Sequence, residues 1–179
     1  MHTAESEAAK YAAMWKIPDY RRHSPGEVIA GNARVFFHPV GPVNDYGMGT
    51  GRAAQLLQNA GFDVQGYDIA PNCRDAGVSV PLEVCCLWDF TPRESDWALC
   101  TDVMEHIPTE HVDAVLANIA KATRKGALFQ IATTPDRMGK LIGQPLHLTV
   151  QGPEWWREKL QEHFAQVEIQ GRVIARCRV

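Results

Sequence analysis

The sequence lacks the cysteine patterns and long apolar runs that mark several large protein classes. Its five cysteines include no C-x-x-C pair, which argues against a zinc site or a disulfide framework and favours reduced, packing cysteines. No apolar stretch approaches membrane-spanning length. The N-terminus is acidic and polar where a secretory signal would carry a basic and then an apolar run. These absences predict a soluble, cytoplasmic protein with no membrane partner.

An excess of basic charge is missing as well. The 179 residues include 18 Lys and Arg against 21 Asp and Glu, which gives a formal net charge of -3 at pH 7. This balance gives no overall reason to expect avid nucleic-acid binding. The length suits one domain with one core, so we expect a single active site.

Apolar and helical segments alternate along the middle of the chain. Helices are expected at about 50–60 and 109–123. The second helix has a core-facing stripe, formed by Val112, Val115, Leu116, Ile119 and Ala120. Strands are expected at about 41–46, 62–68, 82–88, 97–102 and 127–134. This alternation predicts a Rossmann-like, doubly wound α/β fold, in which a mostly parallel, seven-stranded sheet has helices on both faces.

The front of the chain reads as two helices joined by a basic, aromatic loop. Residues 3–15 are rich in Ala and Glu and predict the first helix. Ser24, Pro25 and Glu27 have the spacing of a capping box with proline in the first turn, which predicts the start of the second.

The tail of the chain predicts an antiparallel pair of strands. A helix at 153–164 is followed by strands at 165–170 and 173–179, and the two residues between these strands are too few for a parallel crossover. The sequence therefore predicts a core at 40–179 with an antiparallel C-terminal strand, and an N-terminal helical lid or extension at 1–39.

The stretch "VNDYGMGTGRAAQLL" places three alternating glycines directly behind an apolar strand. Gly47, Gly49 and Gly51 allow a sharp bend and a close approach to a ligand, and the next helix offers free N–H groups. In an open parallel sheet, ligands bind beyond the carboxyl ends of the strands, where the strand order reverses. A plain strand-to-helix turn is the simpler interpretation, but the context favours a ligand site.

Two cofactors fit this turn. "GTGRAA" matches the G-x-G-x-x-A pattern of a dinucleotide site, and Asp68 lies at the distance of a ribose-binding acid. Asp45 would repel a pyrophosphate at the strand tip but would attract an ammonium group. S-adenosylmethionine (SAM) has an ammonium group, a ribose and no phosphate, and Asp68 can accept both ribose hydroxyls. We therefore favour SAM, with NAD as a distant alternative.

Three motifs support this choice by resemblance. "NDYGMGTG", "GYDIA" and "ALCTDVMEHIP" resemble the first, second and fourth motifs of the class I SAM-dependent methyltransferases, over about residues 40–135. "DVMEHIP" is similar to the small-molecule branch typified by ubiquinone-pathway methyltransferases. The resemblance implies SAM as cofactor, with S-adenosylhomocysteine as product. It also implies a set of cofactor-binding residues: Asp45, Gly47, Met48, Gly49, Gly51, Asp68, Ile69, Leu87, Trp88, Thr101 and Asp102.

One position departs from the family pattern. Many relatives place Asp on the third strand to accept the adenine amine, and the matching position here is Cys86, with Asp89 shortly after it. We expect backbone groups and stacking on Trp88 to hold the adenine instead.

The expected reaction is an in-line methyl transfer to an oxygen or nitrogen, less readily a carbon, of a small acceptor that can be anionic. His106 and His147 are the candidate catalytic bases, although His106 could simply orient the next helix. The candidate substrate-binding residues are Tyr20, Arg21, Arg22, Glu105, His106, His147 and Trp155. No metal is expected, and the oligomeric state stays open.

Two other functions stay open. A nucleic-acid or nucleotide methyltransferase is less favoured, because the sequence has neither the N/D-P-P-Y/W motif nor the Pro-Cys nucleophile of DNA methyltransferases. A SAM-binding partner protein without catalytic activity would carry the same cofactor motifs.

Overall fold

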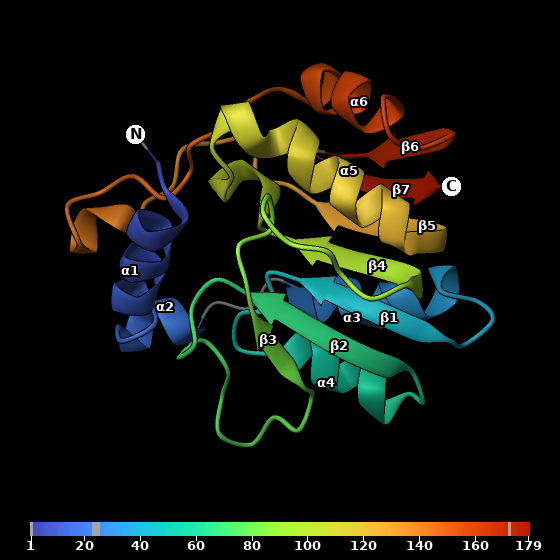
Figure 1. Ribbon diagram of the computed structural model, residues 1–179, viewed down its shortest axis with the longest axis horizontal. Helices are drawn as coiled ribbons and strands as arrows, with labels where there is room; N and C mark the ends of the chain where they lie inside the picture. The colour runs from blue at the N-terminus through green and yellow to red at the C-terminus, as the bar shows by residue number, and fades with distance from the viewer. Residues whose placement is uncertain (1, 23–25, 172) are drawn as a thin grey trace.

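A seven-stranded sheet forms the centre of the computed structural model, which describes residues 2–22, 26–171 and 173–179 (Figure 1). The strands lie in the order β3-β2-β1-β4-β5-β7-β6. Strands β1 to β5 pair in parallel, and β7 runs antiparallel to both β5 and β6. The bounds are β1 Pro42–Tyr46, β2 Asp63–Asp68, β3 Leu82–Val84, β4 Ser95–Thr101, β5 Thr123–Gln130, β6 Gln166–Gln170 and β7 Ile174–Arg178. The predicted fold class is confirmed.

Helices cover both faces of the sheet and the carboxyl ends of its strands. The α-helices are α1 Ala4–Met14, α2 Pro18–Arg22, α3 Gly26–Phe36, α4 Arg52–Asn59, α5 Val112–Ala122 and α6 Pro153–Gln161. Short 3-10 turns occur at η1 Met104–His106, η2 Thr109–His111 and η3 Gly139–Leu141. In Figure 1, α5 and α6 lie on one side of the sheet and α3 and α4 on the other, while α1 and α2 lie beyond the strand tips.

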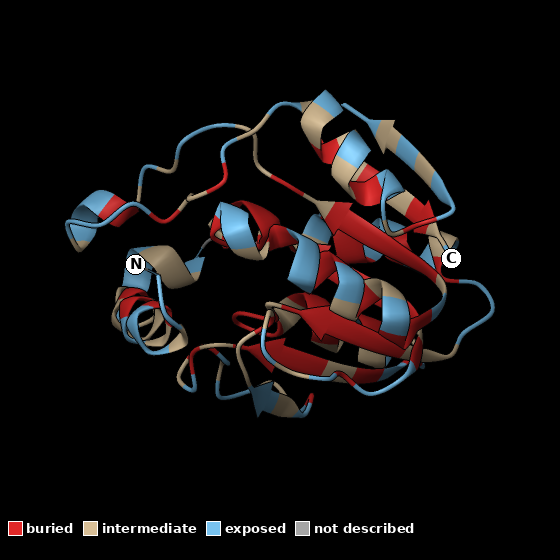
Figure 2. Cartoon of the chain, turned by 45° about the horizontal axis from the view of Figure 1, so that its top comes forward, coloured by how far each residue is buried: buried red, intermediate tan, exposed pale blue. Residues whose placement is uncertain are grey.

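The central strands are buried on both faces, as Figure 2 shows. Along β4, Trp97 and Leu99 pack into the core under α3 and α4, and Ala98 and Cys100 into the core under α5. This alternation follows from the two-residue period of a strand. A parallel sheet with helices on both faces requires apolar side chains on both of its faces, which explains the nearly continuous apolar run in this strand.

Helix α5 confirms the predicted apolar stripe and corrects its ends. Val112, Val115, Leu116 and Ile119 are buried, each at most 1% exposed. The segment begins as a 3-10 turn at Thr109, and the α-helix ends at Ala122. Thr123 was expected in the helix but opens β5, and its hydroxyl donates a hydrogen bond of 2.7 Å to the Ile119 carbonyl. The predicted strand at 82–88 is also shorter, since β3 ends at Val84.

The N-terminal segment contains one more helix than expected. The loop predicted between the first two helices contains α2, a short helix at Pro18–Arg22. Ser24 and Pro25 of the predicted capping box lie outside the described residues. Helix α3 contributes Ile29, Ala30 and Ala33 to the core beside α4. The division into an extension at 1–39 and a core at 40–179 stays a prediction.

No helix in the described part of the chain is both long and apolar enough to cross a membrane.

Replacing Trp97 should show how much of the stability depends on the core under α3. The indole is 1% exposed, stacks on Phe37 at 5.3 Å between ring centroids, and donates a 3.0 Å hydrogen bond to the Pro39 carbonyl. Trp97→Ala should therefore lower the free energy of unfolding by about 3–5 kcal/mol, measured by urea denaturation with circular dichroism. Val35→Ala, at a site that is 85% exposed on α3, is the control and should change stability by less than about 0.5 kcal/mol. Equal effects of the two substitutions would contradict this assignment of the core.

Candidate functional site

The glycine turn follows β1, where the strand order reverses between β1 and β4. Gly47, Gly49 and Gly51 have φ of 71°, 53° and 78°, a left-handed conformation that strains residues with a Cβ. A Cβ on Gly47 would lie 2.2 Å from a methyl of Val103, and one on Gly49 would lie 3.0 Å from the Trp15 ring. Gly47 therefore requires glycine for space as well as for conformation, and a side chain at position 49 would crowd the Trp15 ring.

Asp68 fixes the shape of this turn. It ends β2, is 7% exposed, and accepts hydrogen bonds of 2.9 Å from the backbone N–H groups of Gly49 and Ala70, one on each carboxylate oxygen. Burial raises the pKa of this carboxyl group. Each oxygen keeps a further lone pair, and the side chain lines the cavity beside the turn. The carboxylate can thus accept two hydroxyl donors while it holds the turn in place.

Asp45 is a buried carboxylate with one oxygen that no described residue pairs. It is 2% exposed, and its Oδ2 atom has no hydrogen-bond donor in the described chain. Burial, with a smaller contribution from the charge of Asp68, raises its pKa to about 7. A buried carboxylate is costly unless a cation accompanies it. The side chain therefore fits a ligand that carries an ammonium group.

Two adjoining cavities open at the turn and share five lining residues, Trp15, Tyr20, Gly47, Asp102 and His106. The first is bordered by Asp68, Ile69, Leu87 and Trp88. The second runs from Asp45 and the turn, including Met48, Gly49 and Thr101, to Glu105, His106 and His147. Together they form one cleft that passes from an apolar end to an end with several titratable side chains. Gly51 does not line either cavity, but its left-handed backbone begins α4.

Helices α1 and α2 form the roof of this cleft. Tyr11, Trp15 and Tyr20 line it, and the Trp15 and Tyr20 rings lie 4.7 Å apart. The prediction of the helix at 3–15 missed Tyr11 and Trp15. Their i, i+4 spacing, which places two aromatic rings on one face of a helix, is the signal that could have identified them.

Arg21 attaches the roof to the loop after β2. Its guanidinium donates to the carbonyls of Trp15, Asn72 and Cys73 at 2.8–3.0 Å and pairs with Asp75 at 2.6 Å. Arg22 forms an exposed ion pair with Asp19 on the same helix. Neither arginine lines the two cavities.

Trp155 also lies outside both cavities. It packs edge-to-face against Trp156 on α6, at 4.8 Å between ring centroids. Trp88, in contrast, lines the first cavity and stacks on His111 at 4.7 Å with an interplanar angle of 3°. Cys86, two residues before Trp88, is half-buried, and the Asp89 N–H donates to the Cys86 carbonyl at 3.0 Å.

The turn after β4 carries a strained residue. Asp102 is the one non-glycine residue of the described chain with a positive φ, 53°. Its carboxylate accepts a 2.9 Å hydrogen bond from the Gln130 amide, and its backbone N–H donates to the Gln130 carbonyl at 2.8 Å. Strain of this kind costs about 1–3 kcal/mol and often occurs at functional sites. Asp102 lines the second cavity together with Glu105 and His106, which follow it in the chain.

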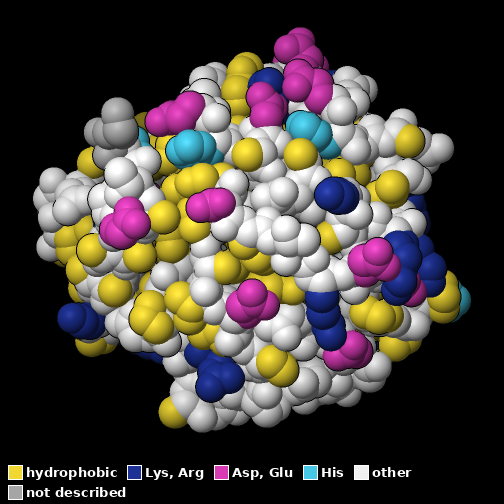
Figure 3. Space-filling model, in the orientation of Figure 1, with side chains coloured by type: hydrophobic (Ala, Val, Ile, Leu, Met, Phe, Trp, Pro, Cys, Tyr) yellow, Lys and Arg dark blue, Asp and Glu magenta, His cyan; other side chains and the backbone are white. Residues whose placement is uncertain are grey.

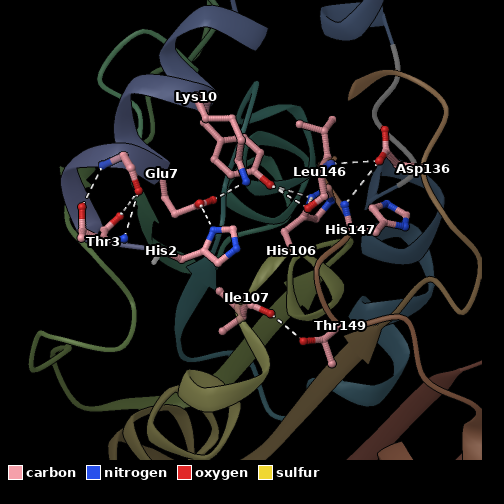
Figure 4. A network of polar contacts seen from close by, with 12 residues as sticks. His2, Thr3, Glu7, Lys10, His106, Ile107, Asp136, Leu146, His147 and Thr149 are labelled. Atoms are coloured by element: carbon pink, nitrogen blue, oxygen red, sulfur yellow. Dashed lines mark hydrogen bonds and ion pairs between the residues drawn. The ribbon is translucent and has the colours of Figure 1, made fainter. Parts of the chain in front are cut away.

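Glu105 and His106 follow this turn, and His147, from the loop after β5, places a ligand atom within 4.8 Å of one from each of them. Figure 4 shows His147 beside His106. Glu105 is completely buried, and desolvation, increased by the charge of Asp102, raises its pKa to about 8. Burial lowers the pKa of His106 to about 3, so its imidazole is neutral at physiological pH. The two imidazole rings meet edge-to-face at 4.7 Å between centroids. The structure thus brings both candidate bases and Glu105 to one end of the cleft.

Comparisons with known proteins agree with this geometry. The sequence pattern of a family described as the methyltransferase domain matches residues 20–170, while no curated protein sequence matches significantly. Magnesium protoporphyrin IX methyltransferase from Synechocystis PCC 6803, solved with bound S-adenosylhomocysteine, is 20% identical with a TM-score of 0.64, covering 86% of this chain and 81% of that one.

Two archaeal structures are similar to the chain. The PH0226 protein of Pyrococcus horikoshii OT3 is 14% identical with a TM-score of 0.68, covering 90% of this chain and 91% of that one. A SAM-dependent methyltransferase from Archaeoglobus fulgidus is 19% identical with a TM-score of 0.63, covering 83% and 73%. At these identities the likeness shows the fold. The family match and the SAM-type cleft together show that the chain belongs to the methyltransferase domain family, as a class I SAM-dependent methyltransferase.

Proposed function

We propose that the chain transfers a methyl group from SAM to an oxygen or nitrogen of a small acceptor bound beside Glu105, His106 and His147. The observation that carries this proposal is the continuity of the cleft. The second cavity begins at Asp45 and the glycine turn and continues to Glu105 and the two histidines under one roof. SAM supplies a methyl group already activated on a positive sulfur, so the protein must mainly align the acceptor and exclude water.

The cofactor assignment follows from the chemistry of the lining. Asp45 would pair with the ammonium group, and Asp68 with the two ribose hydroxyls. Leu87 and Trp88 would contact the adenine in the apolar first cavity, with Ile69 next to Asp68. Thr101 and Asp102, at the end of β4, would lie below the methyl group.

The two histidines suit different roles. A neutral His106 with a strongly lowered pKa is a weak base, so it would position other groups instead of taking a proton. His147 keeps its Nε2 atom free of hydrogen bonds within the described chain and lies at the same end of the cleft. We therefore favour His147 over His106 for direct contact with the acceptor.

The surface favours a small acceptor over nucleic acid. On the face drawn in Figure 3, Lys and Arg side chains are separated by acidic and uncharged ones. Many basic side chains form ion pairs with acids, among them Arg21, Arg52, Arg93, Arg124, Lys125, Arg157 and Lys159. Such pairing reduces the positive field that phosphate backbones require.

Conversion of SAM to S-adenosylhomocysteine distinguishes a methyltransferase from a SAM-binding protein without activity. The purified chain is incubated with SAM and fractions of a metabolite pool, and S-adenosylhomocysteine is measured by mass spectrometry. Product that depends on an added fraction supports the proposal. If S-adenosylhomocysteine binds but no fraction of a broad pool yields product, the binding-protein alternative replaces it.

Replacing Asp68 should abolish tight cofactor binding. Asp68→Ala removes two charge-assisted hydrogen bonds to ribose, each contributing about 1.5–3 kcal/mol, so affinity for S-adenosylhomocysteine should fall by about 100-fold or more in isothermal titration calorimetry. Asp63→Ala, at the opposite end of β2 where the side chain is 67% exposed, is the matched control and should bind as the wild type does. Binding of NAD(H) by the wild type in place of S-adenosylhomocysteine would contradict the assignment.

Asp45 should make cofactor binding depend on pH. The carboxyl group must be ionised to pair with the ammonium group, so affinity should rise as pH increases towards the Asp45 pKa of about 7. It should fall again above the pKa of an α-amino group, about 8, because the ligand then loses its charge. Titration calorimetry between about pH 5.5 and pH 9 would measure both the rise and the fall of the affinity.

Asp45→Asn provides the control for the acid limb. It should bind S-adenosylhomocysteine more weakly, and the decrease in affinity at acid pH should be smaller than in the wild type. An acid limb of unchanged slope in Asp45→Asn would show that another group controls binding.

A further inference from the structure

Three side chains with metal-ligating atoms converge at the acceptor end of the cleft. They are Glu105, His106 and His147, and one ligand atom from each lies within 4.8 Å of the other two. Glu105 and His106 come from the turn after β4, and His147 lies some forty residues later in the loop after β5. The fold has therefore assembled one carboxylate and two imidazoles around a single point.

Both imidazoles are oriented as metal ligands are. His147 Nδ1 lies 2.6 Å from the Thr134 carbonyl oxygen. His106 Nδ1 lies 3.2 Å from the Leu146 carbonyl (Figure 4), and 2.7 Å from the Tyr11 hydroxyl. Because a carbonyl can only accept, the Thr134 contact assigns the proton of His147 to Nδ1. The Leu146 carbonyl favours the same tautomer for His106, with the Tyr11 hydroxyl as a second neighbour of its Nδ1. Each neutral ring then presents a lone pair on Nε2, and no described residue forms a hydrogen bond with either Nε2 atom. Metal-ligating histidines commonly donate their other N–H to a carbonyl in this way.

Glu105 contributes an oxygen that has no partner among the described residues. The side chain is 0% exposed, and its Oε1 atom accepts a 3.1 Å hydrogen bond from the Ala132 N–H. Its Oε2 atom is buried and has no hydrogen-bond donor in the described chain. Leaving a buried carboxylate oxygen unpaired is costly, so this atom independently points to a cationic ligand.

The backbone holds the three ligands in place without any ion. Leu148 and Thr149 both donate their N–H groups to the Glu105 carbonyl, at 2.8 and 2.9 Å. The carboxylate of Asp136 accepts from the N–H groups of Leu146 and His147, at 2.9 and 3.4 Å. The His147 loop is thus fastened to the turn that carries Glu105, and a site built in advance loses little entropy on binding.

We propose that Glu105, His106 and His147 bind a divalent transition-metal ion at the acceptor end of the cleft. Two imidazoles with one carboxylate suit Zn²⁺, Fe²⁺, Mn²⁺ or Co²⁺, whereas Ca²⁺ prefers oxygen ligands throughout. Three protein ligands leave coordination positions open. This inference replaces the expectation, drawn from the sequence, that no metal is needed.

The role of the ion rests on the proposed function, whereas the site itself does not. An acceptor with a hydroxyl or carboxylate oxygen would coordinate at an open position that faces the cleft. Coordination would fix the acceptor next to the end of β4 and lower the pKa of a bound hydroxyl group. The acceptor class would then be a small molecule with oxygen donors, which favours oxygen over nitrogen as the methylated atom.

A second cluster of similar composition provides an internal control. Asp113, Glu162 and His163 also place ligand atoms within 4.8 Å of one another. The Lys159 ammonium lies 3.0 Å from Asp113 and 3.3 Å from Glu162. Lys159 therefore already neutralises part of the negative charge of this cluster. Both carboxylates of the cluster are also exposed. It should not bind a metal ion tightly.

Cobalt titration tests the site without relying on enzymatic activity. The full-length chain is treated with a chelator, desalted and titrated with Co²⁺, while the visible absorption of the ion is recorded. The wild type should bind one Co²⁺ per chain, and Zn²⁺ should displace it. Glu105→Gln and His147→Ala should each weaken binding by more than about 100-fold, since even indirect partners of metal ligands contribute 10–100-fold. His163→Ala, the matched control in the second cluster, should bind as the wild type does.

The variants distinguish the outcomes. Titration of each with S-adenosylhomocysteine shows that its fold and cofactor site are intact, and His147→Ala, in a surface loop, guards against a folding defect in the buried Glu105→Gln. Stoichiometric Co²⁺ binding without any S-adenosylhomocysteine binding would support the metal site and reject the proposed function. Absent Co²⁺ binding, equal binding by wild type and His147→Ala, or loss of binding in His163→Ala would overturn the metal site.

Discussion

The reversal of strand order between β1 and β4 is the constraint on which the site depends. Helix α4, after β1, packs on one face of the sheet, and α5, after β4, packs on the other. The segments that leave β1 and β4 therefore diverge at the ends of these strands. A cleft opens there. The glycine turn after β1 and the strained turn at Asp102 after β4 form its two sides, and a cofactor and an acceptor can meet between them.

The cleft concentrates buried acids for which the described residues supply no cation. Asp45 and Glu105 each have a carboxylate oxygen to which no described residue donates, and Asp68 is buried close to Asp45. Their raised pKa values show that burial disfavours the charged forms. Groups of this kind lower stability in the free protein, and positively charged ligands remove that penalty. An ammonium group at Asp45 and a metal ion at Glu105 would satisfy both ends of the cleft by the same principle.

The roof couples the N-terminal helices to both ends of the cleft. Trp15 packs over Gly49, while the Tyr11 hydroxyl contacts His106, one turn earlier on α1. Glu7 and Lys10 form a buried ion pair on the same helix. A second carboxylate oxygen of Glu7 lies 2.7 Å from Nδ1 of His2 (Figure 4). Arg21 then ties α2 to the loop that follows Asp68. The helices that cover the cleft are thus attached to the residues that would bind its ligands.

Local patterns in the sequence were enough to predict the fold class and the position of the glycine turn. The apolar period of α5, the run of apolar residues in β4 and the glycines at 47, 49 and 51 predicted the fold class and the position of the turn, because strand periodicity, helix periodicity and left-handed turns depend on near neighbours. The two-residue gap before the last strand likewise required an antiparallel pair. Element ends were less predictable, as Thr123 shows, since its hydroxyl closes a helix while its backbone begins a strand.

The tertiary structure alone decided which polar residues share the site. Arg21 and Trp155 are as suitable for an acceptor site in the sequence as His147, yet the first attaches a helix to a loop and the second packs on α6. Tyr11 and Trp15 were not singled out in the sequence but line the roof of the cleft. The approach of His147 to Glu105 depends on backbone hydrogen bonds between segments some forty residues apart. Such contacts arise from packing and chain closure, which no local pattern of residues encodes.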